Sequence, residues 1–353
     1  MFIAIAILGI GFLIFVHELG HFLAAKAFGM RAEKFYIGFP PAALKRKFGE
    51  TEYGIGVIPL GGYVKISGMT REEKVPEDLK SGAFYSKPVW KRIIVVSAGA
   101  AMNLLLAFIL FFVFYWQAVP EYENTNTIAL VQADSGAEHA GLQVGDKLLG
   151  VDGSVSDDPQ VIRDELQSRP DQQATLLVER DGKQQQVTAD IGRQAETGGG
   201  ILGVAFKAVR VGTMDISAPQ AARHAALDIP LITKEVFLFI GNIFSREGIE
   251  DISTPIGIVA FSSETIKMGW GVFVRMLGFI SLQLAILNLL PLLPLDGGHV
   301  VFNLAESIKG SPVRRQTYER VSAIGITFFI ILFMIALMND IQRLLGPGFK
   351  LEP

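Results

Sequence analysis

Four long stretches of apolar residues, almost free of charge, alternate with polar regions along this chain. They cover Met1–Ala25, Ile93–Trp116, Met276–Leu295 and Val321–Asn339. A helix of about 20 apolar residues spans the hydrocarbon core of a bilayer, so the pattern predicts four transmembrane helices. The first stretch lacks a basic leader and a small-residue cleavage site, and we therefore expect it to be retained rather than removed as a signal peptide.

Between the first two stretches the pattern changes to short β-type runs. Three runs read as strands, separated by Pro40-Pro41 and Gly61-Gly62: Ala32–Phe39, Glu52–Leu60 and Tyr63–Ile66. Such breaks are hairpin signals, and they predict a membrane-associated β segment over 32–67. Two interpretations stay open: a purely structural cap, or an edge strand that takes up an extended chain by strand addition.

A second β-rich region, Thr127–Lys207, lies between the second and third stretches. Within it, Pro159–Gln167 has helical spacing after two aspartates suited to capping. Ala174–Arg180 and Gln184–Ile191 predict a hairpin across Asp181-Gly182, a pair typical of tight β-turns. Further along, Asp228–Phe244 predicts an amphipathic helix at the membrane surface, and Thr254–Ile258 predicts a turn back to the bilayer.

Composition and charge narrow the class of protein. Half of the 353 residues are hydrophobic and the mean hydropathy is +0.38, which is too apolar for an ordinary soluble enzyme. A net charge of −3 gives no sign of a nucleic-acid partner, and the absence of cysteine excludes disulfides and thiolate metal ligands.

The distribution of basic residues predicts an orientation. Lysines and arginines gather near the ends of the loop 28–92 and in the short loop 309–320, whereas the segment 117–223 is acidic. The positive-inside rule places the two basic loops in the cytoplasm. Both termini and the region Thr127–Lys207 are then extracytoplasmic, in the cytoplasmic (inner) membrane of a bacterium.

The sequence His17-Glu18-Leu19-Gly20-His21 lies inside the first apolar stretch. Ionisable residues at this depth are costly to bury and are functional by default. Histidines four residues apart lie on one helical face, as two nitrogen ligands of Zn²⁺ require. Glu18 could take the proton of an attacking water, the role of the general base in zinc hydrolysis.

A zinc site for hydrolysis needs a third protein ligand. The segment Asn288–His299 reads Asn-Leu-Leu-Pro-Leu-Leu-Pro-Leu-Asp-Gly-Gly-His, and its two prolines break the helix. Asp296 is the carboxylate available there at membrane depth, so it is the expected ligand. His299 is the rival ligand, and a kinked helix merely capped by Asp296 is the structural alternative.

With HExxH in the first stretch and NxxPxxPxDGG in the third, the chain resembles the site-2 protease family of intramembrane zinc metalloproteases, and especially its bacterial PDZ-containing regulators of sigma-factor signalling. The phrase AGLQVGDKLLGVDG, from Ala140 to Gly153, resembles a PDZ domain of the permuted bacterial type. Two departures stand out. This chain has room for one PDZ domain where well-known members carry two, and the family's Gly-Pro-x-x-Asn reads Gly99-Ala-Ala-Met-Asn103 here.

The resemblance implies the fold and the site. The fold is a polytopic α-helical membrane protein with about four transmembrane helices, a membrane-associated β segment and an inserted β-rich PDZ-like domain. It divides into a first half of the protease core (1–118), an extracytoplasmic PDZ-like domain (119–212) and a second half of the core (213–353). The implied site residues are His17, His21 and Asp296 as Zn²⁺ ligands, Glu18 as the catalytic base, and Asn288 and Asn103 at the substrate or oxyanion, where Asn103 has an interhelical hydrogen bond as its alternative role. Ile201, Leu202 and Gly203 would form a peptide-binding loop of the PDZ-like domain.

The implied activity is cleavage of the transmembrane segments of single-pass membrane proteins within the lipid bilayer. Expected substrates are an anti-sigma factor or similar regulator after a first extracytoplasmic cut, and remnants of signal peptides, with peptide C-termini as further partners of the PDZ-like domain. Two other classes stay open: a membrane-tethered PDZ scaffold without activity, and a transporter-like membrane protein, in which broken helices with buried polar residues are common.

Overall fold

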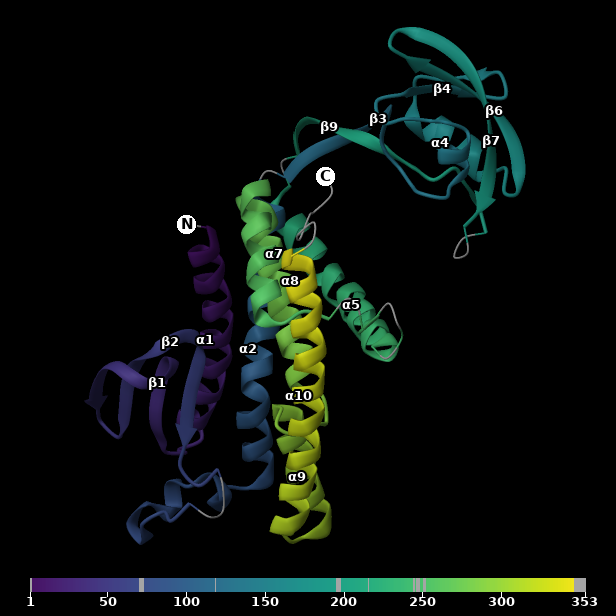
Figure 1. Cartoon of the computed structure of the whole chain (residues 1–353). Helices are drawn as coiled ribbons and strands as arrows, with labels where there is room; N and C mark the ends of the chain where they lie inside the picture. The colour runs from purple at the N-terminus through teal and green to yellow at the C-terminus, as the bar shows by residue number, and fades with distance from the viewer. Residues whose placement is uncertain are drawn as a thin grey trace. The chain divides into compact units, whose positions relative to one another are not determined.

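The computed structural model in Figure 1 describes residues 2–69, 73–117, 119–194, 198–214, 216–243, 245, 248–249 and 252–345. The chain divides into two compact units. One consists of Met1–Gln117 and Ile216–Pro353, and the other is Ala118–Asp215.

The first unit is built mainly from helices. They are α1 (Phe2–Ala27), α2 (Val89–Trp116), α5 (Ala218–Asn242), α7 (Pro255–Met268), α8 (Trp270–Asn288), α9 (Asp296–Lys309) and α10 (Arg315–Leu345), with two short 3₁₀ turns at Glu77–Gly82 and Phe84–Ser86. Among the described residues, α1, α2, α8 and α10 are long and apolar enough to cross a membrane. Each contains most of one predicted apolar stretch, and α2 packs against both α1 and α8.

The third predicted stretch ends earlier than its hydropathy indicated. Helix α8 ends at Asn288 rather than at Leu295, and residues 289–295 form a compact loop before α9 begins at Asp296. Pro291 and Pro294 cannot donate a backbone hydrogen bond or continue a regular helix, so the apolar sequence persists while the helix stops. The carboxylate at the start of α9 lies where the helix dipole favours negative charge.

Two other predicted boundaries also move. Helix α5 begins at Ala218, ten residues before Asp228, because Ser217 and Gln220 form a capping box there. The predicted end of this helix at Phe244 lies outside the described residues. The prediction of a turn at Thr254–Ile258 was wrong: Thr254 caps α7, and its side chain accepts a hydrogen bond from the Ile256 N–H.

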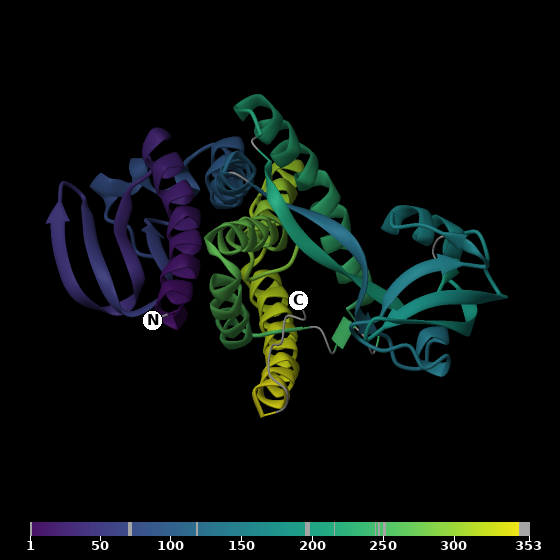
Figure 2. The same ribbon diagram turned by 90° about the horizontal axis from the view of Figure 1, so that it is seen from above.

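The predicted β segment forms from two long, irregular antiparallel strands, β1 (Ala32–Phe48) and β2 (Thr51–Ile66). Lys34–Ile37 in β1 pair on one side with Glu52–Ile55 and on the other with Gly62–Lys65. Register shifts carry β1 past Pro40-Pro41, where the sequence had predicted a break. The run Gly62–Ile66 is therefore an edge of this sheet, and Figures 1 and 2 show the sheet lying against α1.

The second unit is a β-rich fold with two short helices. Its strands are β3 (Val119–Val131), β4 (Lys147–Val151), β5 (Ser154–Val155), β6 (Gln172–Arg180), β7 (Lys183–Arg193), β8 (Gly200–Ile201) and β9 (Val204–Met214), and its helices are α3 (Gly136–His139) and α4 (Pro159–Gln167). The antiparallel sheet runs β8-β7-β6-β4-β3-β9, with β5 beside β4. Asp181 and Gly182 both have positive φ, as the predicted tight turn between β6 and β7 requires.

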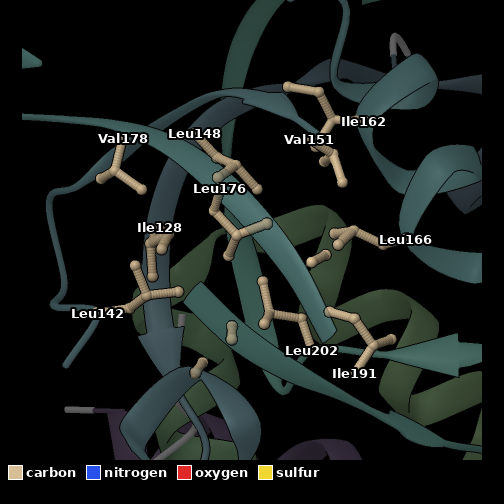
Figure 3. Close-up of a cluster of buried hydrophobic side chains, with 13 residues drawn as sticks. Ile128, Leu142, Leu148, Val151, Ile162, Leu166, Leu176, Val178, Ile191 and Leu202 are labelled. Atoms are coloured by element: carbon tan, nitrogen blue, oxygen red, sulfur yellow. The ribbon is translucent and has the colours of Figure 1, made fainter. Parts of the chain in front are cut away.

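This unit has a hydrophobic core of its own. Figure 3 shows Leu148, Leu176 and Ile162 pointing into a cluster that Leu166 and Ile191 complete, and these side chains are almost fully buried. Burying one such side chain contributes roughly 1.5–3 kcal/mol. Strands β3 and β9 pair from Val131↔Val204 to Val119↔Met214, so the two ends of the unit lie side by side.

Candidate metal centre

Helix α1 presents both histidines of HExxH to the interior of the helical unit. His17 and His21 are each 7% exposed, and their Nε2 atoms lie 3.1 Å apart. The spacing of four residues sets both rings on one face of the helix. The neighbouring apolar side chains of Val16 and Phe22 are buried as well, so the two polar rings lie in an otherwise apolar part of the interior.

Asp296 brings a carboxylate to the same point from a distant part of the chain. Its Oδ2 lies 3.1 Å from Nε2 of His17 and 3.2 Å from Nε2 of His21. Two glycines make this placement possible. A Cβ at Gly297 would lie 2.2 Å from the Leu290 carbonyl oxygen, and one at Gly298 would collide with the same loop. Only glycine allows α9 to begin so close to the loop 289–295.

The three atoms suit a metal ion by their chemistry. The ring Nδ1 of His21 lies 2.9 Å from the Val95 carbonyl, which can only accept, so Nδ1 carries the hydrogen and Nε2 of the neutral ring offers a lone pair. Asp296 Oδ2 is buried and has no hydrogen-bond partner. In a tetrahedral zinc site, bonds of about 2.0–2.1 Å place ligand atoms roughly 3.3 Å apart, close to the separations observed. A divalent cation would satisfy all three.

Helix α2 leaves room for this cluster by means of one glycine. A Cβ at Gly99 would lie 2.4 Å from Nε2 of His21 and 2.8 Å from Nε2 of His17. Facing it, a Cβ at Gly20 would lie 2.4 Å from the Ala98 carbonyl oxygen. Small residues let helices approach closely. Here Gly20 and Gly99 allow the backbone of α2 to contact the imidazole nitrogens of His17 and His21.

Glu18 faces the β segment. Its Oε2 accepts a hydrogen bond of 3.2 Å from the Val64 N–H, and a Cβ at Gly62 would lie 2.6 Å from its Cγ. The carboxylate also interacts electrostatically with both histidines and Asp296. Glu18 therefore lies between the three-residue cluster and the sheet edge Gly62–Ile66.

The structure also shows the surroundings of the other predicted residues of the helical unit, Asn288, Asn103 and the rival ligand His299. The Asn288 side chain donates to the Leu284 carbonyl within α8 at 3.0 Å. Asn103 is fully buried, and its Nδ2 lies 3.5 Å from Nδ1 of His17. His299 packs near the Tyr318 ring and is not a member of the group formed by His17, His21 and Asp296, the one such group of potential ligands among the described residues.

The predicted peptide-binding loop lies at the edge of the second unit. Ile201 in β8 is 39% exposed, whereas Leu202 is buried in the core. The Leu202 carbonyl accepts from the Ala137 N–H, and the Gly203 carbonyl accepts from the Gln132 N–H. Two of the acceptors of this loop are thus already bonded within the unit.

An ion pair that the sequence analysis missed ties α9 to α2. The Arg92 guanidinium donates to Glu306 at 2.8 and 3.2 Å, and the Arg92 side chain is only 7% exposed. Because α9 begins with Asp296, this pair helps to fix the carboxylate relative to the helix that faces the histidines. The residues are 214 positions apart, and no local signal links them. The role of Gly99 had a signal in the sequence, because the spacing Gly99-x-x-x-Asn103 places both residues on one face of α2.

Comparisons with known proteins agree over nearly the whole chain. The sequence profile of peptidase family M50 matches residues 5–332. A protein of Fusobacterium nucleatum, provisionally named a zinc metalloprotease, is 33% identical over 344 residues, covering 96% of this chain and 98% of that protein. A Rickettsia conorii protein with the same provisional name is 34% identical over 368 residues, with coverage of 96% and 98%. Among solved structures, a PDZ domain of an SdrC-like protein from Listeria monocytogenes is 18% identical to this chain, and the match covers 24% of this chain and 90% of that domain. The TM-score of 0.22 is too low to establish a shared fold.

Proposed function

This chain belongs to peptidase family M50, and from that premise we propose that it is an intramembrane zinc metalloendopeptidase that cleaves transmembrane segments of single-pass membrane proteins. The observation that carries the proposal is the convergence of His17 Nε2, His21 Nε2 and Asp296 Oδ2 inside the helical unit, with Glu18 beside them. The provisional names of the relatives identify the metal as zinc.

The three ligands would hold one zinc ion and leave a coordination position open to water or substrate. Bound there, zinc supplies Lewis-acid chemistry: it lowers the pKa of water and polarises a carbonyl group. Glu18 is the proposed general base. Its carboxylate takes the proton of the attacking water and passes it to the leaving amine. The Val64 N–H holds Glu18 in place through a hydrogen bond.

A helical substrate cannot react as it stands, because its backbone groups are bonded to one another. We propose that the edge Gly62–Ile66 takes up the locally unwound substrate as an added strand. Two contacts support this role: Val64 and Gly62 both lie against Glu18. A strand added at this edge would therefore run past the proposed base.

The finer assignments belong to the same proposal. The four apolar helices would cross the inner membrane of a bacterium, with the basic loops in the cytoplasm and both termini and the unit 118–215 outside. The substrates would include an anti-sigma factor or a similar regulator after a first extracytoplasmic cut, and remnants of signal peptides. The ligand cluster favours a protease over a transporter or an inactive PDZ scaffold, because neither of these classes requires a bound zinc ion.

The test is the substitution Glu18→Gln in the full-length protein. It leaves the three proposed ligands untouched, so zinc content should stay at that of the wild type, while cleavage of a single-pass substrate in detergent or liposomes falls by about 10²–10⁴-fold. Glu264→Gln, an exposed carboxylate in α7, is the matched control and should cleave normally. The proposal would be refuted if the wild-type protein contained no zinc, or if cleavage persisted both in Glu18→Gln and after chelation.

A further inference from the structure

Helix α2 meets the histidine pair with three positions, each four residues from the next. The Val95 carbonyl accepts from His21 Nδ1, Gly99 makes room for both rings, and Asn103 lies against His17. Positions at this spacing lie on one face of a helix. The face of α2 from Val95 to Asn103 is thus fitted to the outer side of the ligand pair.

Each imidazole needs a partner on the side away from the metal. A histidine that offers Nε2 to a metal carries its hydrogen on Nδ1, and a carbonyl or carboxylate normally accepts that hydrogen and holds the ring. The Val95 carbonyl does this for His21. For His17, the neighbouring polar group is the side-chain amide of Asn103, with Nδ2 3.5 Å from Nδ1.

The two nitrogens that face each other are both donors when His17 is in the ligating tautomer. The amide oxygen of Asn103 is buried and lacks a hydrogen-bond partner, although a buried acceptor is costly to leave unpaired. Turning the amide by 180° exchanges its oxygen and nitrogen almost without steric change. That single rotation gives the Nδ1–H of His17 an acceptor and gives the Asn103 oxygen a donor.

The backbone at Asn103 is itself held in place. The Ser281 hydroxyl in α8 donates to the Asn103 carbonyl oxygen at 2.8 Å, and both residues are completely buried. A hydroxyl from α8 thus anchors the turn of α2 that carries the amide. The backbone that carries the amide is therefore fixed beside the His17 imidazole.

We infer that Asn103 is the positioning residue of His17: its side-chain oxygen accepts the Nδ1–H hydrogen bond and holds the ring with Nε2 directed at Asp296 Oδ2. This role replaces the one at the substrate or oxyanion. It rests on the metal ligands of the proposed function and adds to them the group that orients one ligand. Loss of such a partner typically weakens metal binding by about 10–100-fold.

The experiment measures zinc affinity in full-length, detergent-solubilised protein by competition with a chromophoric chelator. Asn103→Leu and Asn103→Ala should bind zinc about 10–100-fold more weakly than the wild type. Asn103→Asp keeps an oxygen acceptor and should bind within a few-fold of it. Phe111→Leu, a buried substitution two turns along α2 against α5 and α8, controls for lost packing and should bind normally.

A second readout does not depend on any variant folding. In the zinc-loaded wild type, ¹⁵N NMR should show a His17 Nδ1–H that exchanges slowly with water. Wild-type zinc affinity in Asn103→Leu and Asn103→Ala, or a rapidly exchanging Nδ1–H in the wild type, would overturn the inference while leaving the ligands intact. If the wild type fails to bind zinc, the proposed function fails first, so the two failures are distinguishable.

Discussion

Gly99 lies so close to His21 that a Cβ atom on the glycine would be 2.4 Å from the histidine Nε2. The lining of the candidate metal centre therefore includes a bare stretch of backbone on α2. Any side chain there would occupy the space in which the two imidazole nitrogens and the Asp296 carboxylate converge.

We predict that Gly99→Ala eliminates stoichiometric zinc binding, because the new methyl group cannot be accommodated without moving backbone or ligands. Alanine favours helix over glycine by about 1 kcal/mol, so helix propensity would act in the opposite direction. Zinc content after gel filtration checks the prediction. Gly271→Ala in α8, where the nearest atom would be 3.8 Å from the new Cβ, should retain zinc. Full zinc occupancy in Gly99→Ala would contradict the close approach.

Asp296→Asn should lower zinc retention, whereas His299→Ala should not. A carboxylate supplies charge and a firm oxygen ligand, and a neutral amide is a poor substitute. His299 instead packs against Tyr318 at a ring separation of 6.0 Å. Zinc content after dialysis against a weak chelator measures both variants. The opposite pattern, with zinc lost only from His299→Ala, would exchange the two assignments.

Removing one partner of the Arg92–Glu306 pair should destabilise the helical unit. Glu306→Leu leaves a buried guanidinium without its carboxylate, which typically costs about 3–5 kcal/mol. The double variant Arg92→Met with Glu306→Leu should recover much of that loss. Thermal unfolding in detergent compares them. Lys267→Met breaks the exposed Lys267–Glu264 pair and should change stability by less than about 1 kcal/mol. A double variant as unstable as Glu306→Leu would contradict the explanation.

The unit 118–215 is predicted to control which substrates enter rather than to perform chemistry, since none of the proposed ligands lies in it. Asn124 pairs with Ala208, so deleting Thr127–Lys207 leaves the paired stem closed by Thr125-Asn126. This variant should still cleave a substrate with a short extracytoplasmic tail and should newly cleave an untrimmed one. Gel-based assays measure the cleavage of both substrates. Loss of cleavage of the short-tailed substrate, in protein that keeps its zinc, would favour peptide capture through Ile201–Gly203 instead.

The same unit should lose stability in acid because of Asp146. The Arg180 guanidinium, through hydrogen bonds of 2.7 and 2.6 Å, lowers the pKa of this buried carboxyl below its ordinary 3.8. The unfolded chain therefore binds a proton at Asp146 more readily than the folded chain does. The contribution of the Asp146–Arg180 pair to the free energy of unfolding is complete above about pH 4 and is lost as the pH falls further. Methyl NMR of Leu148 during thermal unfolding follows the folded fraction. Asp146→Asn should be less stable at pH 7, whereas Asp171→Asn, in an exposed ion pair, should behave as wild type. Equal stability of Asp146→Asn and wild type at pH 7 would contradict the prediction.

Periodicity predicted the parts of this chain that depend on local sequence. The spacing of His17 and His21 placed them on one face, the apolar stretches located four long helices, and Asp181-Gly182 marked a tight turn. Periodicity and hydropathy predicted the wrong helix boundaries where prolines or a capping side chain determine them. Hydropathy continues past Asn288 although prolines end α8, and Thr254 begins a helix because its hydroxyl oxygen accepts a hydrogen bond from the Ile256 N–H in the first turn.

Contacts between distant segments could not be predicted in this way. The packing of Gly99 over the imidazoles, the approach of Asn103 to His17 and the Arg92–Glu306 pair each join residues more than 70 positions apart. Such contacts depend on how helices dock, and a single sequence carries no periodic signal for docking. The motifs therefore predicted which residues lie together in the candidate metal centre, but the structure was needed to show which neighbours hold them.

The proposed ligands lie far apart in the sequence, His17 and His21 in α1 and Asp296 at the start of α9, and this has a consequence for synthesis. A ribosome finishes α1 some 270 residues before it reaches the carboxylate, so a nascent chain that contains only the first helices has two of the three proposed ligands. Because a metal site of this kind binds firmly only when every ligand is in place, hydrolytic capacity would arise only after α8 and the loop 289–295 have joined α1 and α2. Fragments cut short by stalled translation would accordingly be inert toward the helices around them.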